Sequence, residues 1–153
     1  MRPDQITYSP QDLTAIVDIS YRQVQYWDKS EFLQPSHRRG RFRSYSFPDL
    51  LKAKLIRKLR SEYDLSIQQI RRITPSLKAE LANYPGCILD FNIVIPDIRA
   101  KNPVILTSNQ ESGRSWPGGR DFFSYNAQNL ARDIRNNQNL SLRTRGMLSY
   151  END

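Results

Sequence analysis

The chain has 153 residues, of which 38% are apolar and 25% charged, and its formal net charge is +7. That length suits one domain or a small domain with a satellite, and no apolar stretch approaches the roughly 20 residues of a membrane span. One cysteine and one histidine exclude an internal disulfide framework and argue against a zinc site or a Cys/His or Ser/His catalytic pair.

The positive charge is concentrated in the first half of the chain. Residues 1–75 hold 14 Lys and Arg against 8 Asp and Glu, whereas residues 76–153 hold 9 against 8. A basic segment beside a nearly neutral one suggests a polyanionic partner for the first half, although a basic composition also serves solubility. No apolar segment follows Met1, so we expect no secretory signal and a cytoplasmic protein.

Two short helices are predicted near the N-terminus. Ser9 followed by Pro10 is typical of a helix start, and the apolar residues behind it recur at helical spacing. Ser20 can cap a second helix, in which Val24, Trp27 and Asp28 form a narrow inward stripe. Two short helices separated by a tight turn indicate a helix-turn-helix.

An arginine-rich hairpin is predicted next, over residues 37–46, with its turn at Gly40. Four arginines within six residues would repel one another without a polyanion nearby. Pro48-Asp49 then opens a third helix and Ser66 caps a fourth. We expect Pro75 to interrupt that helix, with about two further turns over residues 77–84, and Pro85-Gly86 to mark a domain boundary.

The pattern after Gly86 changes to period two, which predicts a half-buried strand over residues 87–95. Further strands are expected at 104–107 and 122–125, followed by a helix at 126–135. The predicted fold class is therefore α+β. It consists of a winged helix-turn-helix domain at 1–75, a short helix and linker at 76–86, and a small α+β module with a polar tail at 87–153.

Residues 8–73 resemble the MerR family of bacterial transcription regulators. The similar blocks, in the family's order, are Tyr8-Ser9, residues 20–28, Leu33-Gln34-Pro35, residues 42–46, Asp49-Leu50 and residues 65–70. Two features depart from the family. The long coiled-coil helix of the family is cut short here by Pro85-Gly86, and Gln25 stands where the family has an arginine. The short β-rich C-terminal module is similar to that of the small MerR-type repressors associated with type V-K CRISPR-associated transposons.

The resemblance implies that the second helix enters the major groove of double-stranded DNA and that the wing binds phosphates. Arg22 offers a fork for guanine, and Gln23 and Gln25 can pair with adenine. Trp27 is expected in the core. The residues predicted to bind DNA are Tyr21, Arg22, Gln23, Gln25, Tyr26, Arg38, Arg39, Arg41, Arg43 and Tyr45.

A homodimer is expected, because one winged domain reads only a few base pairs and two half-sites are needed for specific binding. The predicted strand over 87–95 has five apolar residues on one face, more than a small module can cover alone. We therefore predict that the dimer interface includes Cys87, Leu89, Phe91, Ile93 and Ile95.

The sequence favours a repressor that occludes a pseudo-palindromic operator, because MerR-type activation uses a rigid coiled-coil arrangement that is not evident here. We expect no enzymatic activity and no cofactor. One alternative is an excisionase-like architectural or recombination-directionality protein with the same winged helix. Another is a ligand-sensing regulator, although no polar constellation in the C-terminal half identifies an effector.

Overall fold

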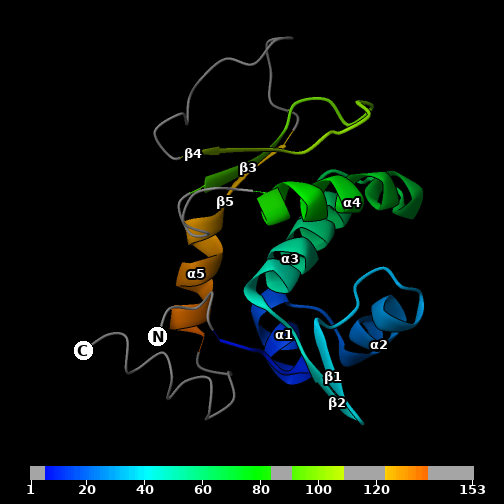
Figure 1. Cartoon of the computed structure of the whole chain (residues 1–153), viewed down its shortest axis with the longest axis vertical. Coiled ribbons are helices and arrows are strands. Elements are labelled where there is room, and N and C mark those ends of the chain that lie inside the picture. Colours follow the sequence, from blue (N-terminus) through cyan, green and yellow to red (C-terminus); the bar gives the residue numbers. More distant parts are fainter. Residues whose placement is uncertain (1–5, 84–90, 109–122, 138–153) are drawn as a thin grey trace. The chain divides into compact units, whose positions relative to one another are not determined.

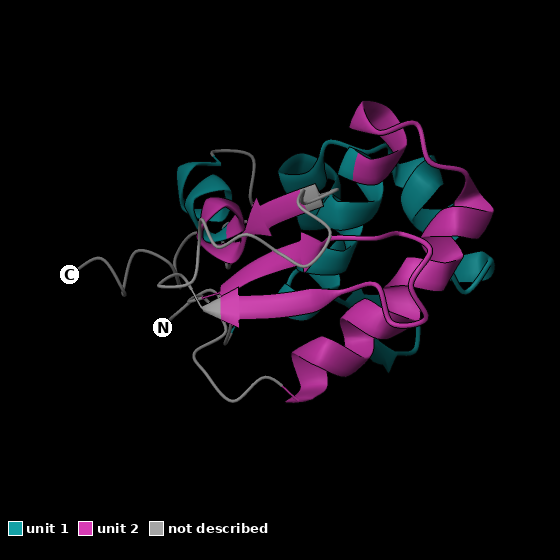
Figure 2. Ribbon diagram, turned by 90° about the horizontal axis from the view of Figure 1, so that it is seen from above, with its two compact units in different colours: residues 1–58, 131–153 teal, residues 59–130 magenta. Residues whose placement is uncertain are grey.

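A computed structural model of the chain describes residues 6–83, 91–108 and 123–137 (Figure 1). The chain divides into two compact units: unit 1 comprises residues 1–58 and 131–153, and unit 2 comprises residues 59–130 (Figure 2). The division falls within one helix, α3 (Phe47–Glu62), and a second helix, α5 (Ala127–Asn136), also has residues in both units. Among the described residues, no helix is long and apolar enough to cross a membrane.

Unit 1 begins with two capped helices, as the sequence predicts. Helix α1 (Pro10–Val17) has Ser9 as its N-cap, and helix α2 (Tyr21–Lys29) has Ser20. Each cap is a capping box, in which the cap serine and the side chain three residues later satisfy each other's backbone N–H groups. Asp18 ends α1 in the left-handed conformation, with φ of 62°, which turns the chain toward α2.

The wing follows α2 as two short antiparallel strands, β1 (His37–Arg39) and β2 (Phe42–Ser44). Helix α3 then starts behind a third capping box between Ser46 and Asp49. The predicted helix-turn-helix, hairpin and third helix are therefore confirmed as elements. The core of unit 1 is apolar and buried, and includes Leu13, Ile16, Val17, Val24, Trp27, Leu33, Phe47, Leu50 and Leu51.

The last turns of α5 complete unit 1. Lys54 of α3 donates to the carbonyl of Ile16 at 3.4 Å and pairs with Asp133 of α5, also at 3.4 Å. The side-chain amide of Asn137 donates to the carbonyl of Ala15 at 3.0 Å. These side chains satisfy carbonyls in the last turn of α1, where no intrahelical donor follows.

Unit 2 contains helix α4 (Ile67–Asn83) and a three-stranded antiparallel sheet in the order β4-β3-β5. The strands are β3 (Phe91–Ile95), β4 (Ile105–Ser108) and β5 (Phe123–Asn126). Helix α4 lies against β4, and the hydroxyl of Ser76 accepts a hydrogen bond from the backbone N–H of Val104 at 3.1 Å.

The expected break at Pro75 is wrong, because α4 continues through this residue as one 17-residue helix. A proline inside a helix removes one backbone hydrogen bond and strains the preceding turn. Ile70, Ile73 and Leu77 on both sides of Pro75 are fully buried, and their packing keeps the two halves of the helix in line.

The units also differ from the predicted domains at 1–75, 76–86 and 87–153. Because α4 packs with the sheet, the segment predicted as a linker helix is part of unit 2. The return of residues 131–137 to unit 1 is not visible in any local pattern, since it depends on contacts between residues more than 100 positions apart, such as Asn137 and Ala15.

The predicted apolar dimer face needs correction. Strand β3 is the central strand, paired on both sides, and all five of its residues are buried, including the alternating Asn92 and Val94. Phe91, Ile93 and Ile95 are already buried within a single chain and present no face to a partner, so their assignment to a dimer interface is wrong. Cys87 and Leu89 lie outside the described residues.

Candidate nucleic-acid interface

The outward surface of α2 is formed by the residues that the sequence predicted. Val24, Trp27 and Asp28 are the buried residues of this helix. The ring of Trp27 packs edge-on against Phe32, with ring centroids 6.0 Å apart. The remaining side chains project toward solvent, and the exposed ones include Tyr21, Arg22, Gln23, Gln25 and Tyr26.

Gln23 has a local structural role in addition to any contact with DNA. Its side-chain oxygen accepts from the backbone N–H of Ser20 at 3.0 Å, while its own N–H donates to the Ser20 hydroxyl at 3.1 Å. This capping box uses the amide oxygen that an adenine contact would also need. Gln25 is exposed and has no such role.

The wing separates its arginines by strand alternation. In the antiparallel register Arg38 lies opposite Arg43, and Arg39 lies opposite Phe42. Successive side chains of a strand point to opposite faces, so Arg38 and Arg43 share one face while Arg39 and Phe42 share the other. The two faces of the wing therefore carry different arginines.

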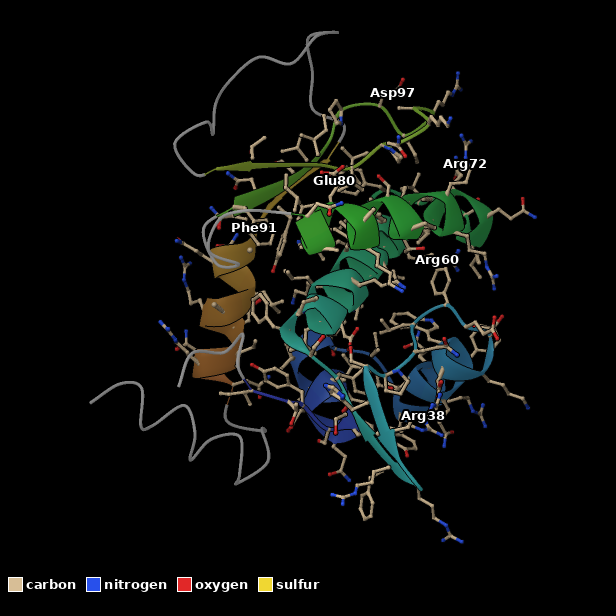
Figure 3. All side chains as sticks on the ribbon, viewed as in Figure 1. Arg38, Arg60, Arg72, Glu80, Phe91 and Asp97 are labelled. Atoms are coloured by element: carbon tan, nitrogen blue, oxygen red, sulfur yellow. The ribbon has the colours of Figure 1, made fainter. Side chains whose placement is uncertain are left out.

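Asp28 ties the first of these faces to α2. It is buried, with 6% of its side chain exposed, and pairs with Arg38 of β1 and with Arg43 of β2, whose Nε lies 3.3 Å away. Figure 3 shows Arg38 between the wing and α2. A buried carboxylate held by two guanidinium groups fixes both strands of the wing against the helix.

The base of the wing is fixed by two further sets of bonds. The carboxylate of Asp49 accepts from the backbone N–H groups of Ser36 at 3.2 Å and Ser46 at 2.9 Å, and also from the Ser36 hydroxyl. Tyr8 pairs with Tyr45 through two backbone hydrogen bonds of 2.8 and 2.7 Å, which places the N-terminal segment beside β2.

Tyr45 is not available to DNA, contrary to its predicted role. Its side chain is fully buried, and its hydroxyl has no hydrogen-bond partner among the described residues. Burial, aided by the negative charge of Asp28, raises the pKa of the Tyr45 hydroxyl to about 12. Tyr45 is therefore a core residue of the wing, in keeping with the general tendency of tyrosine to bury its ring.

The structure thus divides the predicted DNA-binding residues into two groups. In the first group, Arg38 and Arg43 are engaged by Asp28, Gln23 is engaged in the capping box with Ser20, and Tyr45 is buried. The exposed members without such engagement are Tyr21, Arg22, Gln25, Tyr26, Arg39 and Arg41. Sequence reasoning missed the positioning role of Asp28 and the exposure of Phe42. The signal that could have indicated a shared partner for Arg38 and Arg43 is the alternation of the hairpin, which places both arginines on one face.

Gly40 makes the tip of the wing sharp. It has a φ of 61° and, with Arg41, forms the two-residue connection between the paired positions 39 and 42. Glycine is favoured at this first central position of a two-residue hairpin because other residues are strained there. The tip consequently projects Arg41 and Phe42, both exposed.

No three His, Cys, Asp or Glu side chains lie close enough together to hold a metal ion in the part of the chain that the structure describes. Residues 8–77 match the model of a family described as MerR HTH family regulatory protein. No curated protein matches the chain. The match spans α1, α2, the wing, α3 and the first part of α4, so these elements are similar to a MerR-type helix-turn-helix domain.

Proposed function

We propose that the protein is a sequence-specific regulator of transcription that binds double-stranded DNA, a role supported by the match of residues 8–77 to the MerR HTH family model. The observation that carries the proposal is the surface formed by α2 and the wing. It combines exposed Arg22 and Gln25 with exposed Arg39 and Arg41, while Asp28 fixes the wing to the helix. This is the combination of base-reading and phosphate-binding groups that duplex DNA requires.

The proposed mode is repression by occlusion of a promoter. MerR-type activation uses a long coiled-coil helix after the fourth helix. In the described part of the chain the only helix after α4 is α5, which has 10 residues and buries Ala127, Leu130, Ala131 and Ile134. A pseudo-palindromic operator and a homodimer remain part of the proposal, because specific binding needs two half-sites.

The proposed homodimer uses a surface other than Phe91, Ile93 and Ile95, which are buried. Sedimentation velocity on the full chain, alone and with duplex DNA, measures the oligomeric state directly. Two copies per operator are expected, and a one-to-one complex on the preferred site would contradict this part of the proposal.

The test of DNA binding uses salt dependence. For wild-type protein on duplex DNA, log affinity should fall linearly with log salt. The double variant Arg39→Ala, Arg41→Ala should lower the slope by about 0.9 for each phosphate that the protein no longer neutralises. Arg132→Ala is the matched control, because it removes one exposed arginine of α5 in unit 1 and should leave the slope unchanged.

Two results would contradict the assignment. One is a wild-type protein that does not bind duplex DNA at about 50 mM salt. The other is a double variant with the wild-type slope, which would make Arg39 and Arg41 ordinary surface charges. A survey of bound sites across the genome separates a regulator from an excisionase-like protein: a promoter supports the regulator, and attachment or transposon ends support the alternative.

A further inference from the structure

Exposed aromatic side chains are concentrated on α2 and the wing. Among the described residues, the large apolar side chains that are exposed are Tyr21, Tyr26, Phe42 and Tyr63, and three of them belong to this surface. Phe42 is the most exposed at 78%, compared with 57% for Tyr26. It is also the only one of the four without a polar atom that water can solvate.

The bonds of the wing fix the backbone that carries Phe42. Asp28 fixes both strands of the wing, Asp49 fixes its base, and Tyr8 pairs with Tyr45 beside it. An apolar side chain on a fixed hairpin loses little conformational freedom when it meets a partner, so the hairpin is preorganised for binding.

The neighbours of Phe42 indicate what that partner is. Arg39 lies directly across the hairpin on the same face, and Arg41 precedes Phe42 at the tip. Both arginines are exposed, and the structure shows no ion pair for either within the described residues. An apolar ring between two unpaired cations suits a polyanion with apolar surfaces inside its charged rim, as the minor groove of DNA provides.

The minor groove is the groove left to the wing, because α2 is the element proposed for the major groove. The minor groove is about 6 Å wide and admits only thin elements. The wing turns within two residues at Gly40, so its tip is the thinnest part of the hairpin. A phenyl ring cannot bind phosphate, but it can pack on deoxyribose and wedge at a base step.

We propose that Phe42 is a DNA-contacting residue that inserts its ring into the minor groove beside the site read by α2, with Arg39 and Arg41 flanking it. The inference rests on the proposed function and adds a contact of a different chemistry to it. Removal of the ring should weaken binding without changing the salt slope, because the charge of the protein stays the same.

The test uses the duplex that wild-type protein selects from a randomised pool. Phe42→Ala should weaken binding to it by about 10- to 100-fold, equivalent to about 1.4–2.8 kcal/mol. Phe42→Leu should retain most of the affinity, because an apolar wedge remains. Tyr63→Ala, which removes an exposed aromatic ring from unit 2, is the matched control and should bind as wild type does.

Hydroxyl-radical footprinting locates the contact, because these radicals attack deoxyribose hydrogens that line the minor groove. At equal occupancy, wild-type protein and Phe42→Leu should protect a patch of minor groove beside each half-site, and Phe42→Ala should leave that patch unprotected. Since Phe42 is exposed, its variants should unfold at the wild-type temperature, which circular dichroism checks.

The outcomes distinguish this inference from the proposed function. If wild-type protein does not bind duplex DNA, the proposed function fails. If it binds DNA and Phe42→Ala has an affinity within twofold of wild type, DNA binding stands and the role of Phe42 is overturned. If Phe42→Ala binds more weakly but leaves the footprint unchanged, the role of Phe42 is also overturned. A wild-type complex in which Phe42 contacts a protein partner instead would overturn it as well.

Discussion

The wing and the sheet of unit 2 are both small antiparallel sheets, but they place their side chains in opposite ways. The three residues of β1 are all exposed, and Phe42 at the start of β2 leaves most of its ring in water. In β3 all five residues are buried, among them the polar Asn92. The wing is fixed by charged side chains at its margins, whereas β3 is fixed by strands on both sides.

This difference separates a binding surface from a core. Apolar side chains that are buried within the chain have no free surface for a partner, and their alternation along β3 does not change this. Exposed aromatic residues beside unpaired arginines do have such a surface. A period-two pattern by itself therefore does not identify an interface, because the second face of a strand can also be covered.

The largest expected effect comes from placing a charge in the sheet. Phe91 is fully buried in the central strand, so Phe91→Asp should destabilise unit 2 by more than about 4 kcal/mol and abolish its cooperative unfolding. Ser124→Asp, which places the same charge at an exposed position of β5, should cost less than about 1 kcal/mol. Urea unfolding followed by circular dichroism measures both variants.

A stably folded Phe91→Asp protein would break the comparison. If that variant kept the wild-type unfolding midpoint and changed only its sedimentation, β3 would be an interface after all, and the burial of Phe91 within one chain would not hold in solution.

The next effect concerns the attachment of the wing. Asp28→Asn leaves Arg38 and Arg43 without their shared carboxylate, and Arg43 is only partly exposed. We expect a decrease of about 2–3 kcal/mol in the free energy of unfolding, below the full cost of breaking a buried pair because Arg38 remains half in water. The measurement is urea unfolding, with DNA affinity determined on the same samples.

Asp18→Asn provides the matched control for Asp28→Asn. Asp18 also pairs with an arginine, Arg57, at 3.2 Å, but its side chain is 90% exposed. Exposed pairs contribute about 0–1 kcal/mol, so this variant should be nearly as stable as wild type. Equal destabilisation by the two substitutions would show that Asp28 has no special role in holding the wing.

A smaller and more specific effect is expected on α2. Arg22→Ala should cost roughly 1–3 kcal/mol in binding and relax the preference at one base pair of each half-site. Arg39→Ala should instead weaken binding to all sequences alike, since phosphate contacts carry no base identity. Selection from randomised duplexes with each variant distinguishes the two. A retained preference in Arg22→Ala would make Arg22 a backbone contact.

Much of the secondary structure between Ser9 and α4 follows from local sequence rules. The serine caps at Ser9, Ser20 and Ser66 and the turn at Gly40 act within three or four residues of themselves, so the helices and the hairpin are predictable. The exposed residues of α2 follow as well, because Val24 and Trp27 define the inward side of the helix.

The other features depend on contacts between distant residues. Asp28 lies 10 positions from Arg38, so sequence alone does not show that two of the four wing arginines are neutralised. The burial of β3 on both faces and the return of α5 to unit 1 require the whole tertiary structure. Pro75 misleads because its local penalty is outweighed by the packing of Ile73 and Leu77.

The smallest expected effect concerns the hydroxyl of Tyr45, on the buried face of the wing. Within the part of the chain that the structure describes, this group is buried without a hydrogen-bond partner. Tyr45→Phe should therefore change the free energy of unfolding at about pH 7 by no more than about 1 kcal/mol, and toward greater stability. Burial and Asp28 raise its pKa to about 12, above the value near 10 of an unfolded tyrosine. The native state therefore holds this proton more tightly than the unfolded state does. The corresponding stability is present below about pH 10 and disappears between about pH 10 and 12.

Tyr45→Phe has no proton to release between about pH 10 and 12, so its advantage over wild type in urea unfolding should grow across that range. A constant difference from about pH 8 to 12 would place the Tyr45 hydroxyl in water, and the two faces of the wing would then no longer differ at this residue.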